Sequence, residues 1–264
     1  MASTSKYLSK LAKSRVLILG GTSGIGFAVA EASLEYGATV VVSSSNPQRI
    51  SRAVERLQTT YPEHASRISG FACDLSQADS IESNLEKLFQ FATSASGLLD
   101  HIVFTAGDPL KIPALSEVTV ENLNQLGNVR FMGSMMVGKL APKYLNPRPT
   151  SSITLTGGVN SEKPLPGWAA IASYGAGLEG MMRGFAVDLK PVRVNLVSPG
   201  LVQTELLDSI PEAHRGPMLE KGAKATTVGV VGQPEDLAEA YLYTMKDHFV
   251  TGSVIHSNGG ALLV

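Results

Sequence analysis

A glycine-rich stretch, Gly20-Gly21-Thr22-Ser23-Gly24-Ile25-Gly26, follows the apolar run at 16–19 and precedes a helical pattern. The phosphates of a dinucleotide need such glycines: one makes the tight turn, one lets the backbone approach the pyrophosphate, and one lets helix pack on strand. The helix N-terminus adds free N–H groups and the positive end of its dipole. Because the turn joins a strand to a helix, it predicts a dinucleotide site formed by Gly20, Thr22, Ser23, Gly24, Ile25 and Gly26.

Working outward, short apolar runs alternate with longer helical patterns. The predicted strands are Arg15–Leu19, Ala38–Val42, Arg67–Ala72, His101–Thr105, Ser151–Leu155, Arg193–Val197 and Ser253–His256. The predicted helices are Ile25–Tyr36, Pro47–Thr60, Ser76–Ala95, Val118–Tyr144, Ala169–Leu189 and Pro234–Lys246. The strands are apolar throughout, which is typical of a parallel sheet covered on both faces. We therefore expect an α/β fold: a Rossmann-type, doubly wound, parallel seven-stranded sheet with helices on both faces, in a single domain spanning 1–264.

Two stretches break this alternation, and both are predicted to lie at the carboxyl ends of the strands, where ligands bind in such sheets. One is a proline-rich region from Pro142 to Pro166, and the other is a polar loop from Thr204 to about Val230.

Composition excludes several classes of protein. With 22 basic and 23 acidic side chains among 264 residues, no basic face is required, so nucleic acid is a poor candidate for a partner. The single cysteine, Cys73, cannot form an internal disulfide, which fits a reducing compartment. The sequence contains no run of 18 apolar residues, which a membrane span would need. The spacing of the five histidines does not match that of metal ligands. The basic, serine-rich residues 1–15 resemble a transit peptide in composition, but the first strand follows at once, so we interpret the protein as cytoplasmic.

The end of the second strand indicates which dinucleotide binds. An NAD site usually places an acid about 20 residues after the turn to hold the ribose 2′-hydroxyl. Here the segment 42–49 contains no acid, so a 2′-phosphate would meet no repulsion. The expected donors are Ser43, Ser44, Ser45, Asn46 and Arg49, and they predict NADP(H) rather than NAD. The alternative is that these are ordinary polar loop residues and that other groups hold the nucleotide.

Further motifs follow the predicted strands. They are Cys73-Asp74-Leu75, Thr105-Ala106-Gly107, Asn128, Ser198-Pro199-Gly200 with Val202 and Thr204, Thr251-Gly252 and Gly259-Gly260. Together with the glycine-rich turn they resemble the short-chain dehydrogenase/reductase (SDR) family over nearly the whole chain, although Leu19 stands where the family usually has Thr. The resemblance implies that Asp74 and Leu75 contact the adenine of the cofactor and that Ala106 and Gly107 also line the cofactor site. It further implies that the nicotinamide is contacted by Pro199, Gly200, Val202 and Thr204.

The catalytic residues of that family are missing. The family uses a Ser, a Tyr thirteen positions later and a Lys four further on, and these positions align with Gly158, Ile171 and Gly175. Tyr174 offers a shifted register, but Leu178 stands four residues after it, and none of the seven tyrosines is followed by Lys at that spacing. Reduction of a ketone yields an alkoxide that needs a proton and charge stabilisation, whereas an iminium is already cationic and yields a neutral amine. The sequence therefore favours reduction of a C=N⁺ bond.

A closer similarity points in the same direction. The segment Lys163-Pro164-Leu165-Pro166-Gly167-Trp168 is similar to the Pro-Asp-Pro-Gly-Trp motif of the fungal reductase/Diels–Alderases that make bridged diazaoctane indole alkaloids such as malbrancheamide and paraherquamide. That group also lacks the Ser, Tyr and Lys, and Arg130 matches its Arg two positions after the tetrad Asn. The similarity implies NADPH-dependent reduction of a prenylated, dipeptide-derived iminium, followed by an intramolecular [4+2] cycloaddition. Leu165 departs from the group's Asp, which puts the proton-transfer step in doubt.

Four side chains are candidates for the chemistry, each with a structural alternative. Trp168 is expected to stack on the substrate or to be a plain core aromatic, and Arg130 to donate to a substrate oxygen or to form a surface ion pair. Asp108 replaces the missing acid or caps a loop. Asn128 is the tetrad residue or is only structural. The substrate pocket is predicted to include Gly158, Leu165, Pro166 and Ile171, where loss of the catalytic side chains opens volume for a bulky substrate.

Four functions remain open at this point. They are a bifunctional iminium reductase and cyclase, a reductase of an imine or activated alkene without cyclisation, an NADP-binding pseudoenzyme that regulates a partner, and a cyclase or isomerase that keeps NADP only as structure. The family resemblance also implies a homodimer or homotetramer that pairs the helices at 118–144 and 169–189.

Overall fold

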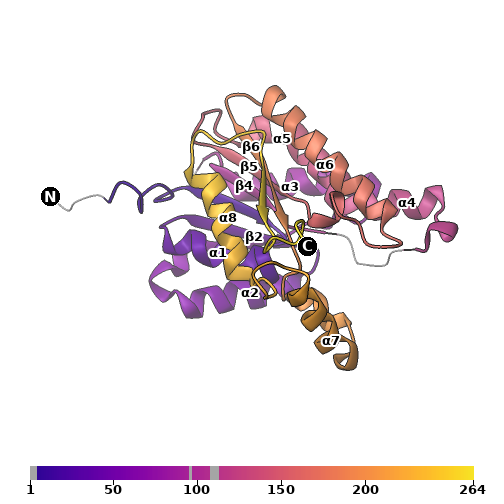
Figure 1. Cartoon of the computed structure of the whole chain (residues 1–264). Coiled ribbons are helices and arrows are strands. Elements are labelled where there is room, and N and C mark those ends of the chain that lie inside the picture. The colour runs from indigo at the N-terminus through magenta and orange to yellow at the C-terminus, as the bar shows by residue number, and fades with distance from the viewer. Residues whose placement is uncertain (1–4, 95–96, 108–112) are drawn as a thin grey trace.

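The computed structural model describes residues 5–94, 97–107 and 113–264 and contains one seven-stranded, wholly parallel sheet (Figure 1). The strand order is β3-β2-β1-β4-β5-β6-β7, so the chain order reverses between β1 and β4. The strands are β1 Arg15–Leu19, β2 Thr39–Ser44, β3 Ile68–Ala72, β4 His101–Phe104, β5 Ser152–Thr156, β6 Arg193–Pro199 and β7 Val254–Ser257. The predicted fold class is confirmed, with strand bounds within two residues of those expected.

Helices cover both faces of the sheet, and each face has its own apolar core (Figure 1). Helices α1 Gly24–Glu35, α2 Pro47–Thr60 and α8 Pro234–Lys246 pack on one face. Helices α3 Ile81–Ser94, α5 Gly133–Tyr144 and α6 Ala169–Asp188 pack on the other. Strands β4, β5 and β6 are buried at every position. The prediction that the strands are apolar throughout is wrong for β5 and β6, which alternate polar and apolar residues. Burial is possible there because polar side chains such as Thr154, Thr156 and Asn195 form hydrogen bonds inside the core.

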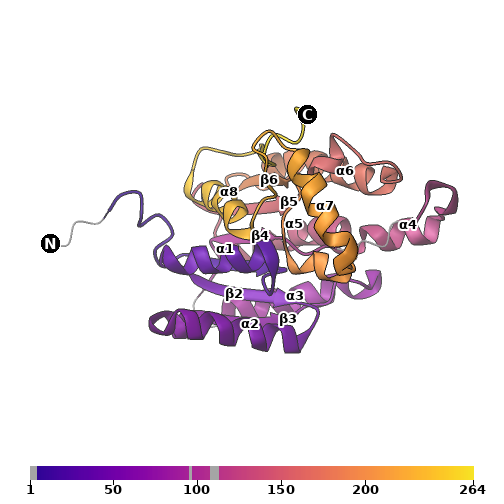
Figure 2. The same ribbon diagram turned by 60° about the horizontal axis from the view of Figure 1, so that its bottom comes forward.

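One prediction about the helices is wrong, and another holds but misses a change of helix type. The stretch predicted as a loop from Thr204 to about Val230 contains a short 3₁₀ turn and helix α7, Glu212–Lys224. Helix α7 buries none of its residues, so its sequence has no apolar stripe that would indicate a helix. It also contains Pro217, which is unfavourable inside a helix. In Figure 1, α7 projects below the sheet, and in Figure 2, where that side turns forward, α7 lies in front of the strand ends.

The long helix predicted at 118–144 is three segments. Helix α4, Val120–Gly127, begins at a capping box formed by Thr119 and Asn122. A π-helical turn at Asn128–Met132 follows, and α5 begins at Gly133. Single π turns inside helices are frequent at functional sites, because the extra residue re-aims the neighbouring side chains. Arg130 lies in this turn. Among the described residues, no helix combines the length and apolar character needed to cross a membrane.

The amino end of the sheet holds a buried histidine with an unusual protonation equilibrium. The Nδ1 of His101, on β4, lies 2.8 Å from the Oγ of Ser152, on β5. Burial lowers the pKa of His101 to about 3; nearby Arg193 acts in the same direction and Asp100 opposes it. His101 is therefore neutral in the folded protein across the pH range in which the same histidine of the unfolded chain takes up a proton.

This equilibrium predicts an acid-labile component of stability. Below about pH 6.5 the unfolded chain binds a proton at His101 that the folded chain excludes down to about pH 3, so the free energy of unfolding falls as the pH falls. We expect His101→Gln to reduce this slope by up to about 1.4 kcal/mol per pH unit, measured by urea unfolding between pH 7 and pH 4.5. The exposed His214 provides the control, His214→Gln, and equal slopes for both variants would contradict the prediction.

Candidate active site

The glycine-rich turn packs closely on the neighbouring strand ends, with no room for a side chain at Gly20 or Gly26. The amides of Gly20 and Gly21 donate to the carbonyl of Ser43, at 2.8 and 3.1 Å. A β-carbon at Gly26 would overlap the carbonyl oxygen of Gly20 and the Oγ1 of Thr105. Gly20 also has a φ of +86°, which only glycine adopts readily. These contacts join β1, β2, β4 and α1 at one point and hold the start of α1 at the carboxyl edge of the sheet.

An anionic oxygen already lies at the start of α1. Ser23, the N-cap residue, makes no side-chain capping bond, and the amide of Gly24 donates to Oε2 of Glu205 at 2.8 Å. Thr204 packs on the same turn, because a β-carbon at Gly24 would be 3.0 Å from the β-carbon of Thr204. The amide of Gly24, at the N-terminus of α1, thus donates to a carboxylate oxygen. Amides at helix N-termini also donate to phosphate oxygens. The residues present fit a dinucleotide pyrophosphate, and Thr204, which is predicted to contact the nicotinamide, packs beside this turn.

At the end of β2, one of the predicted phosphate donors is buried and another caps a helix. The hydroxyl of Ser43 is buried and has no hydrogen-bond partner within the described part of the chain. The side chain of Asn46 caps α2 by accepting from the amide of Arg49 at 3.0 Å. Ser45 and Arg49 are exposed, and Ser44 is half-buried. The donors most accessible to a 2′-phosphate are therefore Ser45 and Arg49, and this strand end carries no acid.

The segment after β3, which is predicted to contact adenine, offers an exposed side chain at one residue and only backbone at the next. Asp74 is exposed, and its Oδ1 accepts from the amide of Ser76 at 2.9 Å. The side chain of Leu75 is buried in the core, so only its backbone is available to a ligand.

Arg130 is brought to the segment after β4. Its Nε donates to the carbonyl of Ala106 at 3.4 Å, and its guanidinium lies where a β-carbon of Gly107 would be. Asn128, in the same π turn, donates from Nδ2 to the carbonyl of Ser76 at 2.9 Å. Asn128 therefore ties the turn to the segment after β3, which is the structural alternative. Asp108 lies outside the described residues.

The segment after β6 closes the site from the other side. A β-carbon at Gly200 would be 3.0 Å from the carbonyl oxygen of Asn258, so Pro199 and Gly200 pack closely on the segment after β7. Val202 is buried and forms an isolated bridge with Gly232. The motif residues from 199 to 204 thus extend from the end of β6 to the glycine-rich turn.

The face that lacks the catalytic triad is open at one position and filled at another. A β-carbon at Gly158 would meet only the carbonyl oxygen of Pro199, at 3.9 Å, so space remains there. A β-carbon at Gly175 would be 3.0 Å from the β-carbon of Ser161. The expectation that the missing side chains leave open volume is therefore correct at Gly158 and wrong at Gly175. Sequence spacing could not detect Ser161, because it lies three residues beyond the aligned motif position.

Two tyrosines form hydrogen bonds near the end of β5: Tyr174, on α6, and Tyr241, on α8 at the opposite face of the sheet. The hydroxyl of Tyr174 donates to the carbonyl of Leu123 at 2.8 Å. The hydroxyl of Tyr241 lies 2.7 Å from the Oγ1 of Thr156, and burial raises the pKa of Tyr241 to about 12. Burial of Tyr241 thus acts against the lowered pKa that a catalytic tyrosine needs.

The predicted substrate wall lies between β5 and α6. Trp168 is half-buried and is the N-cap residue of α6, and its amide donates to the carbonyl of Leu165 at 3.0 Å. The side chain of Leu165 is 54% exposed, Pro166 is exposed and Ile171 is half-buried. This wall has apolar surface available to a ligand.

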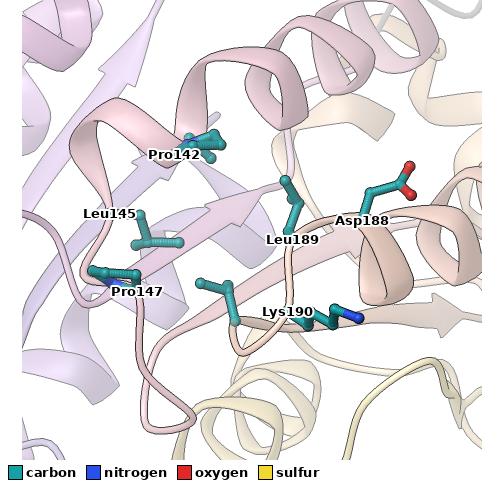
Figure 3. A pocket seen from close by; sticks show the side chains of 8 residues that line it. Pro142, Leu145, Pro147, Asp188, Leu189 and Lys190 are labelled. Atoms are coloured by element: carbon teal, nitrogen blue, oxygen red, sulfur yellow. The ribbon is translucent and has the colours of Figure 1, made fainter.

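Of two hollows on the surface, one adjoins the glycine-rich turn and the other lies far from it. One, of about 290 Å³, is lined by Gly24, Thr204 and Glu205 together with residues of α1, α2, α7 and α8. The other, of about 150 Å³, lies between the C-terminal ends of α5 and α6 (Figure 3). Its residues Leu145 and Val192 precede β5 and β6, so this hollow lies at the opposite edge of the sheet from the glycine-rich turn.

Comparisons with known proteins agree with this geometry. The SDR-like Rossmann domain family matches residues 7–264. Over the full length of both chains, the sequence is 42% identical to the short-chain dehydrogenase/reductase malC of Malbranchea aurantiaca and 43% identical to fsr5 of Gibberella fujikuroi. The solved structure of the MalC reductase/Diels-Alderase from Malbranchea aurantiaca is similar with a TM-score of 0.93, over 98% of this chain and 100% of that chain. A small-chain dehydrogenase in complex with NADPH, 29% identical, has a TM-score of 0.76 over 96% of this chain and 100% of the other.

The contact between Glu205 and the glycine-rich turn predicts a cost to dinucleotide binding. A pyrophosphate at the start of α1 meets the like charge of Glu205, so Glu205→Gln should lower the dissociation constant of NADP⁺ by about two- to fivefold. Isothermal titration calorimetry at low and high salt measures the change and its screening. Glu235 lines the same hollow without bonding Gly24, so Glu235→Gln is the control. An unchanged or raised dissociation constant for Glu205→Gln would contradict the prediction.

Proposed function

This chain belongs to the SDR family, and we propose that it is an NADPH-dependent iminium reductase that also guides an intramolecular [4+2] cycloaddition of the reduced product. The substrate class is a prenylated, indole-containing iminium derived from a dipeptide, and the product is a bridged diazaoctane indole alkaloid. Family membership makes the protein an oxidoreductase; the cofactor preference, the substrate and the cyclisation are the proposal.

One observation carries this proposal: the dinucleotide turn is intact while the proton-donating residues are absent. Gly158, Ile171 and Gly175 cannot donate a proton or stabilise an alkoxide. When bound, the reduced nicotinamide supplies a hydride. Because an iminium carbon accepts that hydride without a proton and becomes a neutral amine, the residues of this chain need only bind and orient the substrate.

Arg130 and the open face at Gly158 support the second step. The guanidinium of Arg130 lies against Gly107, where it can donate to a substrate amide oxygen and fix its orientation. The space over Gly158, the half-buried Trp168 and the apolar Ile171 provide a wall for a polycyclic substrate. A cycloaddition requires no acid or base; it requires one folded conformer and the exclusion of water.

The similarity to MalC supports the bifunctional reading, and Leu165 supports the alternative. The solved MalC structure is that of a reductase/Diels-Alderase, whereas fsr5, at nearly the same identity, is named only as a short-chain dehydrogenase/reductase. Leu165 stands where the similar group carries an Asp that handles protons, and its side chain is 54% exposed. An imine or activated-alkene reductase without cyclisation is therefore the second candidate.

The deciding experiment uses NADPH deuterated at the transferable position and a prenylated, tryptophan-containing dipeptide iminium, followed by chiral liquid chromatography and mass spectrometry. We expect deuterium in a single bridged stereoisomer that is absent without enzyme. Trp168→Ala should reduce the stereochemical excess because it removes the largest side chain of the wall. Leu165→Asp, assayed in parallel, shows whether a carboxylate at this position changes the rate of either step.

Each other outcome selects a different function. Deuterium in an uncyclised or racemic product contradicts the cyclase activity and leaves a reductase. An altered isomer ratio without deuterium contradicts hydride transfer. No effect of the protein on either measurement contradicts the substrate class.

The preference for NADPH is tested at Arg49. The exposed guanidinium of Arg49 follows β2 at a strand end that carries no acid. Arg49→Glu should raise the KM for NADPH about tenfold, because it replaces attraction to the 2′-phosphate by repulsion, and should leave the KM for NADH within about twofold. Arg52→Glu makes the same charge change at an exposed position of α2 one turn later and serves as the control. Equal effects of both variants on both cofactors would exclude a specific phosphate contact.

A further inference from the structure

The 3₁₀ turn Glu205–Ser209 connects the motif after β6 to helix α7, and its first side chain is bound to α1. Oε2 of Glu205 accepts from the amide of Gly24 at 2.8 Å. Gly24 is the first residue of α1, so its amide has no partner within that helix. In this type of fold, amides at that position bind the pyrophosphate of a dinucleotide. The exposed carboxylate of Glu205 and a cofactor phosphate therefore compete for one donor.

The turn and the first part of α7 are joined to each other by a side chain of α7. The guanidinium of Arg215 donates to Oδ1 of Asp208 at 3.0 Å and to the carbonyl oxygen of Ile210 at 3.3 Å. Both acceptors lie between Glu205 and α7 in the chain. A displacement that begins at Glu205 is therefore passed to the first turn of the helix. We call residues 205–215 the latch segment.

Helix α7 has little stability of its own. It has 13 residues, contains Pro217 and buries none of its side chains, and isolated helices of this length are marginal in water. Its C-terminal end is held, because a β-carbon at Gly222 would overlap the side chain of Leu201. Just beyond that end, the amide of Thr227 donates to the carbonyl of Gly259 at 2.8 Å. Release of the latch segment would leave α7 attached at this end and free to fray at the other.

The latch segment borders open space on the ligand side of the sheet. The hollow of about 290 Å³ beside the glycine-rich turn is lined by Glu205, Asp208 and Arg215 together with residues of α1, α2 and α8. In Figure 2, α7 lies in front of the strand ends. The dinucleotide turn lies at the same edge of the sheet, so a movement of α7 changes access to that edge.

We propose that Glu205 is a latch that couples the cofactor site to α7. Its carboxylate takes the place of a cofactor phosphate at Gly24 and holds the latch segment on α1. The pyrophosphate of a dinucleotide displaces this carboxylate and releases the segment, so α7 becomes mobile over the strand ends when the cofactor is bound. The proposal rests on the cofactor part of the proposed function and is independent of the reaction and of the substrate.

The size of the coupling follows from linkage between the two equilibria. A latch that raises the dissociation constant of the dinucleotide by some factor also lowers the population of released segment by that factor, because one equilibrium between latched and released states determines both. A factor of about two to five in the dissociation constant therefore appears as the same factor in the exchange of amides within the segment.

Hydrogen–deuterium exchange of the full chain, with mass spectrometry of peptides that cover 205–215, measures the release. The amides of Leu207 and Arg215 are each hydrogen-bonded at 3.0 Å in the latched state, so they report its loss. We expect saturating NADP⁺ to speed exchange in these peptides about two- to fivefold. Glu205→Ala should show the faster exchange without NADP⁺ and no further rise with it. Glu235→Ala, which removes another acid that lines the hollow, is the control and should respond as the wild type does.

Two fragments of the cofactor show which part of it releases the segment. 2′-Phospho-ADP-ribose carries the pyrophosphate without the nicotinamide and should speed exchange as NADP⁺ does. Adenosine 2′-monophosphate has no pyrophosphate and should leave exchange unchanged. Calorimetry under the same conditions confirms that each ligand saturates the protein.

Several results would overturn the latch. They are unchanged or slower exchange at 205–215 with NADP⁺, a response to adenosine 2′-monophosphate equal to that to NADP⁺, and wild-type exchange in ligand-free Glu205→Ala. If calorimetry detects binding of none of these ligands, the cofactor part of the proposed function fails, and the ligand-free comparison still decides whether Glu205 holds the segment. No substrate is present in any of these measurements, so their outcome is separate from that of the proposed reaction.

Discussion

At Gly26, helix α1 approaches β1 and β4 so closely that a single β-carbon would overlap Gly20 and Thr105. This contact places the N-terminus of α1 at the carboxyl edge of the sheet, between β1 and β4, where the strand order reverses. The other parts of the site are arranged around this point. Thr204 and Glu205 fold onto the turn from β6, and Arg130 lies over the segment that follows β4. A larger residue at Gly26 would displace the helix and with it every group that depends on its position.

The site keeps the part of the fold that binds a dinucleotide and changes the part that handles protons. These two parts come from different elements: the first from the ends of β1, β2 and β6, the second from β5 and α6. Because the sheet positions them independently, Gly158, Ile171 and Gly175 can replace the usual catalytic side chains without disturbing the turn. Ser161 then packs against Gly175, so the altered face is closed at one position and open at Gly158. Function diverges here through a few residues on an unchanged scaffold.

The sequence was most informative where burial is simplest. Short runs rich in β-branched residues predicted the seven strands, because a parallel sheet covered on both faces buries its central strands. The bounds of α2 were predicted to the residue, because Asn46 caps it and Pro47 begins it. The π turn at Asn128–Met132 and helix α7 were not predicted, because neither buries an apolar stripe of its own. Glu205 and Ser161 were not predicted for another reason: their roles come from contacts between segments distant in the chain, which no local spacing encodes.

Overall identity separates the candidate reactions poorly, since malC and fsr5 are equally similar to this chain. The physical distinction lies in what each reaction asks of the wall between β5 and α6. Hydride transfer to a cation requires that the site tolerate positive charge, and the absence of the lysine at Gly175 removes a charge that would repel it. Cycloaddition requires in addition that the product of the first step stay folded in one conformer before release. Trp168, Leu165 and the space at Gly158 control that second requirement, so the reaction depends on the rigidity of one short segment rather than on a further catalytic group.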